Sequence, residues 1–274
     1  MTAGPAPETV FDGDLLQARL WWPDRPTTAL YVTFRQWLPD PGRFSDRGRV
    51  QRALTAGLAH LHIQSRWNDW FLNPETPDLE AALQALRARF LTARAMGFSM
   101  GGYGTLRFSA ALRLNQALLI SPQVSLDPGL VPEEDRYPEA AAFDPVAGDL
   151  ASHARKDLKG VVAFDPFYKL DAQHARLICR LLPGIQAARL PFGGHPGTAA
   201  IGQAGGFRSL QRLSLSSRLA AQDILRLHRD LRGGSWRYWR ERAEACLRQD
   251  RLAGAAIALE RAELLAGPDP AQTG

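Results

Sequence analysis

The chain has 274 residues, 45% of them hydrophobic, which suits one large domain or one domain with a small appendage. No run of eighteen apolar residues occurs, and residues 1–8 lack the basic and apolar segments of a secretory signal, so we expect neither a membrane span nor export. The net charge is +5, but the arginines are spread singly along predicted helices, so we do not expect nucleic-acid binding.

The two cysteines, Cys179 and Cys246, are far apart in the sequence and lie inside predicted helices. Their spacing fits neither a disulfide framework nor a metal site. We therefore expect a cytoplasmic protein with buried thiols, no metal and no cofactor.

The first predicted element is an antiparallel hairpin at the edge of a sheet. Residues 9–11 and 15–22 are β-like runs on either side of Asp12-Gly13-Asp14, and Asp-Gly between such runs is a hairpin signal. Short apolar runs then predict buried strands at residues 29–34, 60–64, 94–98, 116–121, 160–164 and 186–190.

Helical patterns alternate with these strands. They cover residues 49–58, 77–90, 103–114 and 171–182, and the chain is largely helical after Thr198. Alternation of this kind predicts an α/β fold with a mostly parallel sheet and helices on both faces. Residues 122–158 interrupt it with a long stretch rich in Pro, Asp and Glu, which we interpret as a lid-like insertion.

The segment Gly97-Phe98-Ser99-Met100-Gly101 has the G-x-S-x-G spacing of a nucleophile elbow. A serine on such a tight strand-to-helix turn has strained backbone angles, and its neighbours two before and two after press together, which explains Gly97 and Gly101. The turn also places Ser99 at a helix N-terminus, where the partial positive charge favours an oxyanion. The alternative is a glycine-rich turn before an ordinary helix.

A serine nucleophile needs a base, and the base needs an acid to orient it. His195 lies in a Phe-Gly-Gly-His-Pro-Gly loop just after the last predicted strand, so we assign it as the base; the alternative is a loop histidine that caps a turn. The acid has two candidates, Asp165 directly after its strand and Asp171 six residues later. We assign it to Asp165, since Asp171 has a sufficient role as a helix N-cap.

The oxyanion hole is expected to use the backbone N–H of Met100 and a second N–H from the loop after Phe34, at Arg35 or Gln36, of which we choose Gln36. This loop lacks an HGGG-type sequence, so Gln36 is also consistent with an ordinary loop residue. Trp67 to Trp70 follow the strand at 60–64 and therefore lie at the same edge as Ser99. They fit an acyl or sugar subsite and equally fit aromatic packing.

With these residues in place, the chain resembles the α/β-hydrolase superfamily of serine hydrolases over about residues 29–197. The resemblance rests on the Ser99 pentapeptide with Gly102, on Asp165-Pro after a strand, and on the Gly194-His195 loop. Residues 97–108 and Ser121-Pro-Gln also look like the hydrolase-like proteins of bacterial accessory secretion systems. The resemblance implies Ser99 as nucleophile, His195 as base and Asp165 as acid.

Residues 233–267 are predicted to form a helical hairpin that faintly resembles one tetratricopeptide unit. One such unit cannot bury its own face, so we expect it to pack on the hydrolase domain, on a second copy of the chain or on a protein partner. The domain division expected is 1–232 for the hydrolase domain, 233–267 for the hairpin and 268–274 for a disordered tail.

The sequence thus predicts a serine hydrolase acting on a small-molecule or glycan carboxylic ester. The same residues would serve an O-acyltransferase acting on a glycan. A rival of a different class is a non-catalytic interaction protein that keeps the fold and docks through its C-terminal helices.

Overall fold

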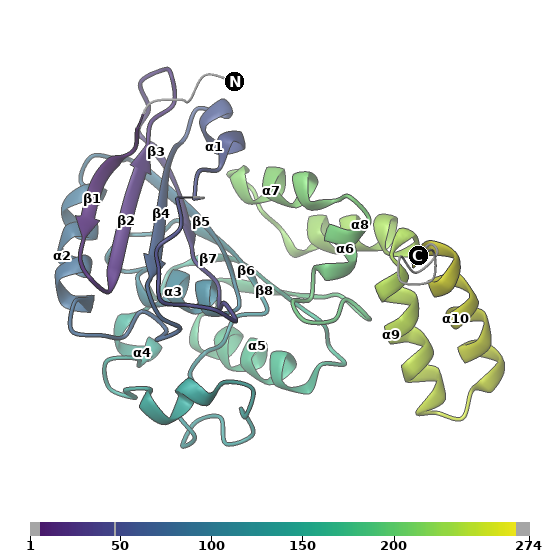
Figure 1. The fold of residues 1–274 in the computed structure, drawn as a ribbon. Coiled ribbons are helices and arrows are strands. Elements are labelled where there is room, and N and C mark those ends of the chain that lie inside the picture. The colour runs from purple at the N-terminus through teal and green to yellow at the C-terminus, as the bar shows by residue number, and fades with distance from the viewer. Residues whose placement is uncertain (1–5, 47, 267–274) are drawn as a thin grey trace, which may run out of the picture.

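A computed structural model of the chain describes residues 6–46 and 48–266. An eight-stranded sheet runs through it in the order β1-β2-β4-β3-β5-β6-β7-β8 (Figure 1). The strands are β1 Glu8–Asp12, β2 Leu16–Trp21, β3 Ala29–Phe34, β4 Ala59–Ser65, β5 Thr92–Phe98, β6 Gln116–Ile120, β7 Lys159–Phe164 and β8 Ile185–Arg189.

The expected fold class is confirmed. β1 and β2 form an antiparallel hairpin, β2 also runs antiparallel to β4, and every pairing from β4 to β8 is parallel. The hairpin turn lies where Asp-Gly predicts it, and Gly13 N–H donates to the Leu16 carbonyl at 3.0 Å. Parallel strands place their carboxyl ends at one edge, so the loops after β3, β5, β7 and β8 meet there.

Helices cover both faces of the sheet (Figure 1). They are α1 Gln51–Thr55, α2 Thr76–Arg87, α3 Met100–Arg107, α4 Leu150–His153, α5 Lys169–Leu181, α6 Ala199–Gln203, α7 Phe207–Leu215, α8 Ala221–Leu231, α9 Trp236–Leu247 and α10 Leu252–Ala266.

Each face of the sheet has its own buried apolar cluster, because side chains of a central parallel strand alternate between two covered faces. Leu79 and Leu83 of α2, Leu106 of α3 and Ile178 of α5 belong to the larger cluster. The second cluster is covered by α1, α6, α7 and α8 and includes Ala53, Ile201, Leu210 and Ile224.

The helix that follows Ser99 is displaced from its expected position. We expected residues 103–114, whereas α3 spans Met100–Arg107 and the chain then continues in turns. Helical backbone therefore begins at the residue directly after Ser99, since the strand ends in a turn of a single residue. This position brings the unpaired N–H groups of the first helical turn beside the Ser99 side chain.

The insertion at 122–158 folds over the edge of the sheet, as the teal segment at the foot of Figure 1 shows. It contains a 3₁₀ turn at Pro138–Ala142 and α4 and is otherwise irregular. Val124, Leu126 and Val131 are nearly fully buried in the larger cluster. The first part of the insertion is therefore packed into the larger apolar cluster.

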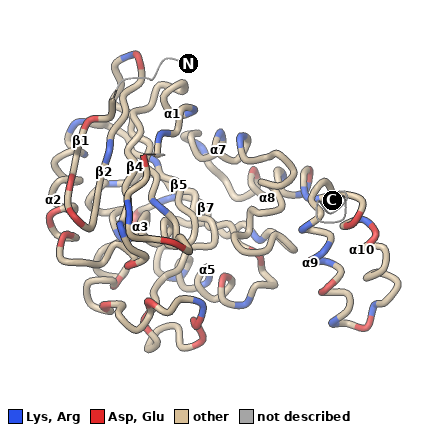
Figure 2. The backbone as a smooth tube through the Cα atoms, in the orientation of Figure 1, with Lys and Arg blue, Asp and Glu red and all other residues tan. Residues whose placement is uncertain are grey.

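α9 and α10 form the expected helical pair and stand off from the sheet (Figure 1). α10 packs on α9 through Ala255, Ala258 and Ala262, and α9 contacts α6. Basic and acidic residues are interspersed along α9, whereas those of α10 lie only in its C-terminal half (Figure 2). The predicted tail at 268–274 lies outside the described residues, and within residues 6–46 and 48–266 no helix is long and apolar enough to cross a bilayer.

Candidate active site

Ser99 occupies a strained turn between β5 and α3. Its backbone angles are φ 47° and ψ −123°, a region that side chains rarely adopt. A Cβ on Gly97 would lie 2.4 Å from the Gly101 carbonyl oxygen, and a Cβ on Gly101 would lie 2.7 Å from the Phe34 carbonyl oxygen. Both contacts are with backbone atoms that cannot move aside, so the spacing of the two glycines follows from this turn.

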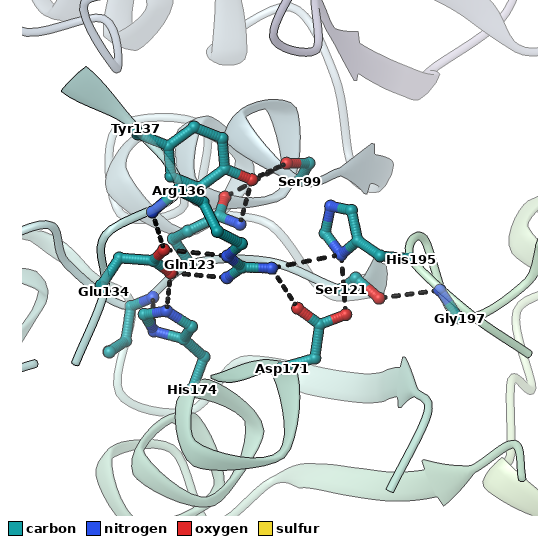
Figure 3. Close-up of polar contacts among 11 residues, drawn as sticks. Ser99, Ser121, Gln123, Glu134, Arg136, Tyr137, Asp171, His174, His195 and Gly197 are labelled. Atoms are coloured by element: carbon teal, nitrogen blue, oxygen red, sulfur yellow. Dashed lines mark hydrogen bonds and ion pairs between the residues drawn. The ribbon is translucent and has the colours of Figure 1, made fainter. Parts of the chain in front are cut away.

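The Ser99 side chain is 6% exposed and lies under the insertion. Its Oγ is 3.1 Å from the Tyr137 hydroxyl and 3.4 Å from Oε1 of Gln123. Gln123 Nε2 in turn donates to the Tyr137 hydroxyl at 3.1 Å, so the three side chains close a ring (Figure 3). Because the Gln123 amide donates to Tyr137, the consistent assignment has Tyr137 donating to Ser99 and Ser99 donating to Gln123.

Ser99 and His195 line one cavity of about 340 Å³. Its other walls come from the loop after β3, from the insertion and from the residue after His195, namely Gln36, Trp37, Arg136, Tyr137 and Pro196. The structure therefore brings the predicted serine and histidine to one site, although no hydrogen bond joins them among the described residues. In Figure 3 the imidazole nitrogen Nε2 lies on the Ser99 side of the ring.

His195 is bonded to Asp171 and not to Asp165. Nδ1 of the imidazole is 2.8 Å from Oδ2 of Asp171, whose side chain is fully buried (Figure 3). Arg136 Nη1 lies 3.5 Å from the same Nδ1, but a guanidinium only donates and a carboxylate only accepts. The shorter contact therefore assigns the proton to Nδ1, which leaves the Nε2 lone pair free to accept one.

The Asp165 carboxylate has a different set of partners. It accepts the Phe167 N–H at 2.9 Å and the Gly194 N–H at 3.0 Å. Burial raises its pKa, and these backbone hydrogen bonds offset part of that rise. Asp165 thus holds the loop that carries His195, since its position directly after β7 aims the carboxylate at the backbone of the neighbouring loop.

Our reason for setting Asp171 aside does not hold in the structure. The N-cap of α5 is Tyr168, and Asp171 lies within the first turn of the helix. Its side chain caps nothing and instead contacts His195 and Arg136. Burial acts to raise the pKa of Asp171, but hydrogen bonds and charge from His195, Ser121 and Arg136 outweigh it and hold that pKa below its usual value.

Arg136, from the insertion, links the His195–Asp171 pair to the buried side chains of Glu134 and His174. Its Nη1 lies 2.8 Å from Oδ1 of Asp171, and its Nε lies 2.8 Å from Oε1 of Glu134. His174 Nε2 contacts the other Glu134 oxygen at 2.7 Å, and Val124 N–H donates to His174 Nδ1, so Nε2 carries the proton. Sequence reasoning missed this chain of contacts.

The one guanidinium and the two carboxylates of this network stabilise one another's charges. Burial would raise the pKa of Glu134, but hydrogen bonds from Arg136 and His174 prevail and lower it to about 2. Burial would lower the pKa of Arg136, yet its two carboxylate partners raise it above its ordinary value. The two acids therefore stay ionised and the guanidinium stays charged over the whole physiological range.

Two backbone N–H groups beside Ser99 have no acceptor within residues 6–46 and 48–266. One belongs to Met100, the first residue of α3, and the other to Gln36, which lines the Ser99 cavity. Arg35 N–H, by contrast, donates to the Ile63 carbonyl at 2.9 Å. Of the two residues considered in this loop, Gln36 is therefore the one whose N–H is available.

Residues 67–70, after β4, were considered either as a substrate subsite or as aromatic packing, and individual residues differ in which role they fit. Trp70 is 1% exposed and meets the Tyr137 ring edge-on at a centroid distance of 4.8 Å, so it packs in the core. Asn68 bonds the backbone of Leu38 through both ends of its amide. Trp67 is 50% exposed and lies at the wall of a separate cavity.

No protein-family model and no curated protein matches the chain. Several solved structures match the chain. An acylaminoacyl peptidase bound to a chloromethyl ketone is 12% identical with a TM-score of 0.51, over 81% of this chain and 44% of its own. The capsule O-acetyltransferase of Neisseria meningitidis serogroup A is 13% identical with a TM-score of 0.49, over 73% and 92%.

Est1E from Butyrivibrio proteoclasticus is 12% identical with a TM-score of 0.46, over 76% of this chain and 99% of its own. At such identities the likeness concerns the fold alone. Together with the sheet order and the helices on both faces, the match to the acylaminoacyl peptidase shows that this chain has the α/β-hydrolase fold.

Proposed function

We propose that the protein is a serine hydrolase that cleaves carboxylic esters, with Ser99 as nucleophile, His195 as general base and Asp171 as the acid that orients the base. The observation that carries the proposal is the cavity shared by the strained Ser99 and by His195, whose Nδ1 is bonded to a buried carboxylate. A serine on a strained turn that shares a cavity with a histidine–carboxylate pair is the arrangement that acyl transfer needs.

The reaction begins with a rotation of the Ser99 side chain. At rest its hydroxyl is bonded to Tyr137 and Gln123, and a change of χ1 between staggered positions turns Oγ toward Nε2 of His195. Hydrogen bonds of this kind are often absent without substrate and form in the complex. Oγ then attacks the ester carbonyl carbon while Nε2 takes the hydroxyl proton.

The tetrahedral intermediate places a negative charge on the former carbonyl oxygen. The N–H groups of Met100 and Gln36 are available to donate to it, and the N-terminus of α3 adds a favourable dipole. His195 returns its proton to the leaving alcohol, which leaves an acyl-Ser99 ester. Water, deprotonated by His195, attacks this ester, and His195 then returns the proton to Ser99 Oγ as the acid is released. A sugar hydroxyl in place of water would give acyl transfer with the same residues.

Asp171 supports both proton transfers. It is ionised, buried and bonded to Nδ1, so it fixes the tautomer and stabilises the imidazolium that forms. Arg136 shares this carboxylate, which fixes its position from the side opposite the imidazole. The Asp165 and Ser121 side chains hold the His195 loop through the N–H groups of Gly194 and Gly197.

The test is turnover of p-nitrophenyl acetate. We expect hydrolysis by the wild type and its loss in Ser99→Ala, while Ser217→Ala, which alters an exposed serine outside the cavity, retains wild-type turnover. Equal turnover by the wild type and Ser99→Ala would overturn the proposal. In the rival account of a non-catalytic interaction protein, the folded wild type would not turn over any ester.

A further inference from the structure

A second cavity, of about 250 Å³, lies beside the Ser99 cavity. Its walls come from the aromatic loop after β4 and from the 3₁₀ turn of the insertion, and they include Trp67, Trp70, Glu139 and Phe143. The volume is below that of pockets for drug-sized ligands, which start at roughly 300 Å³, so it suits one ring-sized group. Nothing in the proposed reaction uses these residues.

Two of the residues at this cavity carry buried polar atoms with no partner. Within the described part of the chain, Nε1 of Trp70 and Oε2 of Glu139 make no hydrogen bond. The other carboxylate oxygen, Oε1, accepts the Trp37 indole N–H at 3.2 Å, which fixes the Glu139 side chain. An unpaired buried donor or acceptor costs about 1–3 kcal/mol, so a donor and an acceptor left unpaired at one cavity point to a ligand that satisfies them.

The same cavity adjoins the catalytic site through two aromatic side chains. Trp37 and Tyr137 line the Ser99 cavity. Trp37 is bonded to Glu139, and the Tyr137 ring meets Trp70 at 4.8 Å. The Tyr137 hydroxyl is 3.1 Å from Ser99 Oγ. The Tyr137 side chain therefore lies between the nucleophile and a ligand in the second cavity.

The chemistry of the walls selects among ligand classes. An indole N–H needs an acceptor and a carboxylate oxygen needs a donor, and a hydroxyl supplies both. Trp67, half exposed, adds an aromatic face on which the C–H face of a ring can lie. An alkyl chain would leave both polar atoms unpaired. An anion would meet the Glu139 and Asp69 carboxylates at the cavity wall.

We propose that this cavity binds a saccharide ring, which is the alcohol part of the ester substrate. The ring lies against Trp67, and on its entry the Trp70 and Glu139 side chains shift so that a ring hydroxyl accepts from Trp70 Nε1 and donates to Glu139 Oε2. The position of the ring relative to the scissile bond rests on the proposed function of Ser99, whereas binding of the ring itself does not.

The experiment therefore measures binding without turnover. Saturation-transfer NMR is recorded on the full-length Ser99→Ala protein with the methyl β-glycosides of glucose, xylose and N-acetylglucosamine. At least one glycoside is expected to bind, and Trp67→Ala in the same background should weaken that binding at least tenfold. Glu139→Gln should weaken it as well, since the amide oxygen would accept the Trp37 N–H and the NH2 group left facing the hydroxyl cannot accept its proton. Trp236→Ala, a tryptophan change on α9, is the matched control and should leave binding unchanged.

Two results would overturn the inference. One is the absence of any Trp67-dependent signal from the three glycosides in folded protein. The other is Trp67-dependent binding of methyl ferulate without binding of any glycoside, which would make the cavity an acyl subsite. Glycoside binding that depends on Trp67, in a protein whose wild type hydrolyses no ester, would support the saccharide site and overturn the proposed function instead.

Discussion

The turn that carries Ser99 and the insertion that covers it are fixed by different kinds of interaction. The turn at residues 97–101 is determined by contacts between neighbours in the sequence, where backbone atoms leave no room for a Cβ. The insertion at 122–158 is held by buried ion pairs, and Arg136 reaches Asp171 thirty-five residues away. Steric constraints between neighbouring residues produce a motif that can be recognised in a single sequence. Ion pairs between residues far apart in the chain produce no such motif.

The comparison explains why the two regions contribute differently to the site. In the proposed mechanism, the turn supplies the nucleophile position and the Met100 N–H, and both exist before any substrate is bound. The insertion supplies Tyr137 and Gln123, which bond the Ser99 hydroxyl at rest, and Arg136, which shares the Asp171 carboxylate. Changes in the turn should therefore abolish chemistry or folding, and changes in the insertion should alter stability and its dependence on pH.

The largest expected effect separates the two aspartates. Asp171→Asn should lower kcat/KM for p-nitrophenyl acetate by about 10⁴-fold, because the amide cannot hold Nδ1–H and stabilise the imidazolium. Asp165→Asn should lower it by no more than about tenfold and mainly reduce Tm, since Asp165 bonds only backbone N–H groups of its own and the neighbouring loop. A larger loss of kcat/KM in Asp165→Asn than in Asp171→Asn would instead identify Asp165 as the acid that orients His195.

The second largest effect should come from placing a side chain at Gly97, where the turn leaves no room for a Cβ. Gly97→Ala should destabilise the protein by about 3 kcal/mol or more and abolish esterase activity, because the new Cβ would lie 2.4 Å from the Gly101 carbonyl oxygen. Gly202→Ala, in α6, is the matched control: a Cβ there meets nothing within 4 Å and should change stability by less than about 1 kcal/mol. Urea unfolding of both variants measures the difference, and equal stabilities would contradict the steric account.

A smaller effect, with a defined pH dependence, should come from the insertion. The pKa of Glu134 is about 2 in the folded protein against 4.5 unperturbed, so its ionised form stabilises the fold above pH 4.5. That stabilisation, on the order of 3 kcal/mol, is lost as the pH falls from 4.5 toward 2, because the unfolded chain takes up the proton first.

Glu134→Gln should therefore be less stable than the wild type at pH 7, and the gap should shrink as the pH falls through this window. Denaturant unfolding at pH 7, 4.5 and 3 checks it. A gap of the same size at all three pH values would mean that the charge of Glu134 does not hold the insertion.

Much of the fold could be predicted from the sequence. The buried strands are short apolar runs separated by helical patterns, and Asp-Gly marks the first turn, so the hairpin and the parallel sheet follow from local signals. The helix after Ser99 was placed three residues late, since Gly101, Gly102 and Gly104 have low helix propensity. Their close packing against Phe34, Phe71 and Pro122 is visible only in three dimensions.

The candidate site was predicted in part. Local patterns pointed to Ser99, His195, Met100 and Gln36. Ser99, His195 and Gln36 line one cavity, and the N–H groups of Met100 and Gln36 have no acceptor within the described residues. The choice between the two acids could not be made from the sequence, because two aspartates follow the same strand and the sequence does not show which carboxylate turns toward the imidazole. In the structure it is Asp171 that contacts His195.

Arg136, Glu134 and His174 form a network whose members come from the insertion and from α5. Each looks like a solvated charge or an ordinary helix histidine in the sequence. Only the fold shows that their side chains are buried together, so no pattern in a single sequence could have identified them.

The central claim is that the Ser99 hydroxyl is an activated nucleophile. Labelling with a fluorophosphonate probe, followed by mass spectrometry of the modified peptide, tests it most directly because the probe requires no knowledge of the substrate. The account predicts modification at Ser99 in the wild type, loss of labelling in Ser99→Ala and a strong reduction in His195→Asn. A folded wild type that stays unmodified, or equal labelling of the wild type and Ser99→Ala, would contradict it.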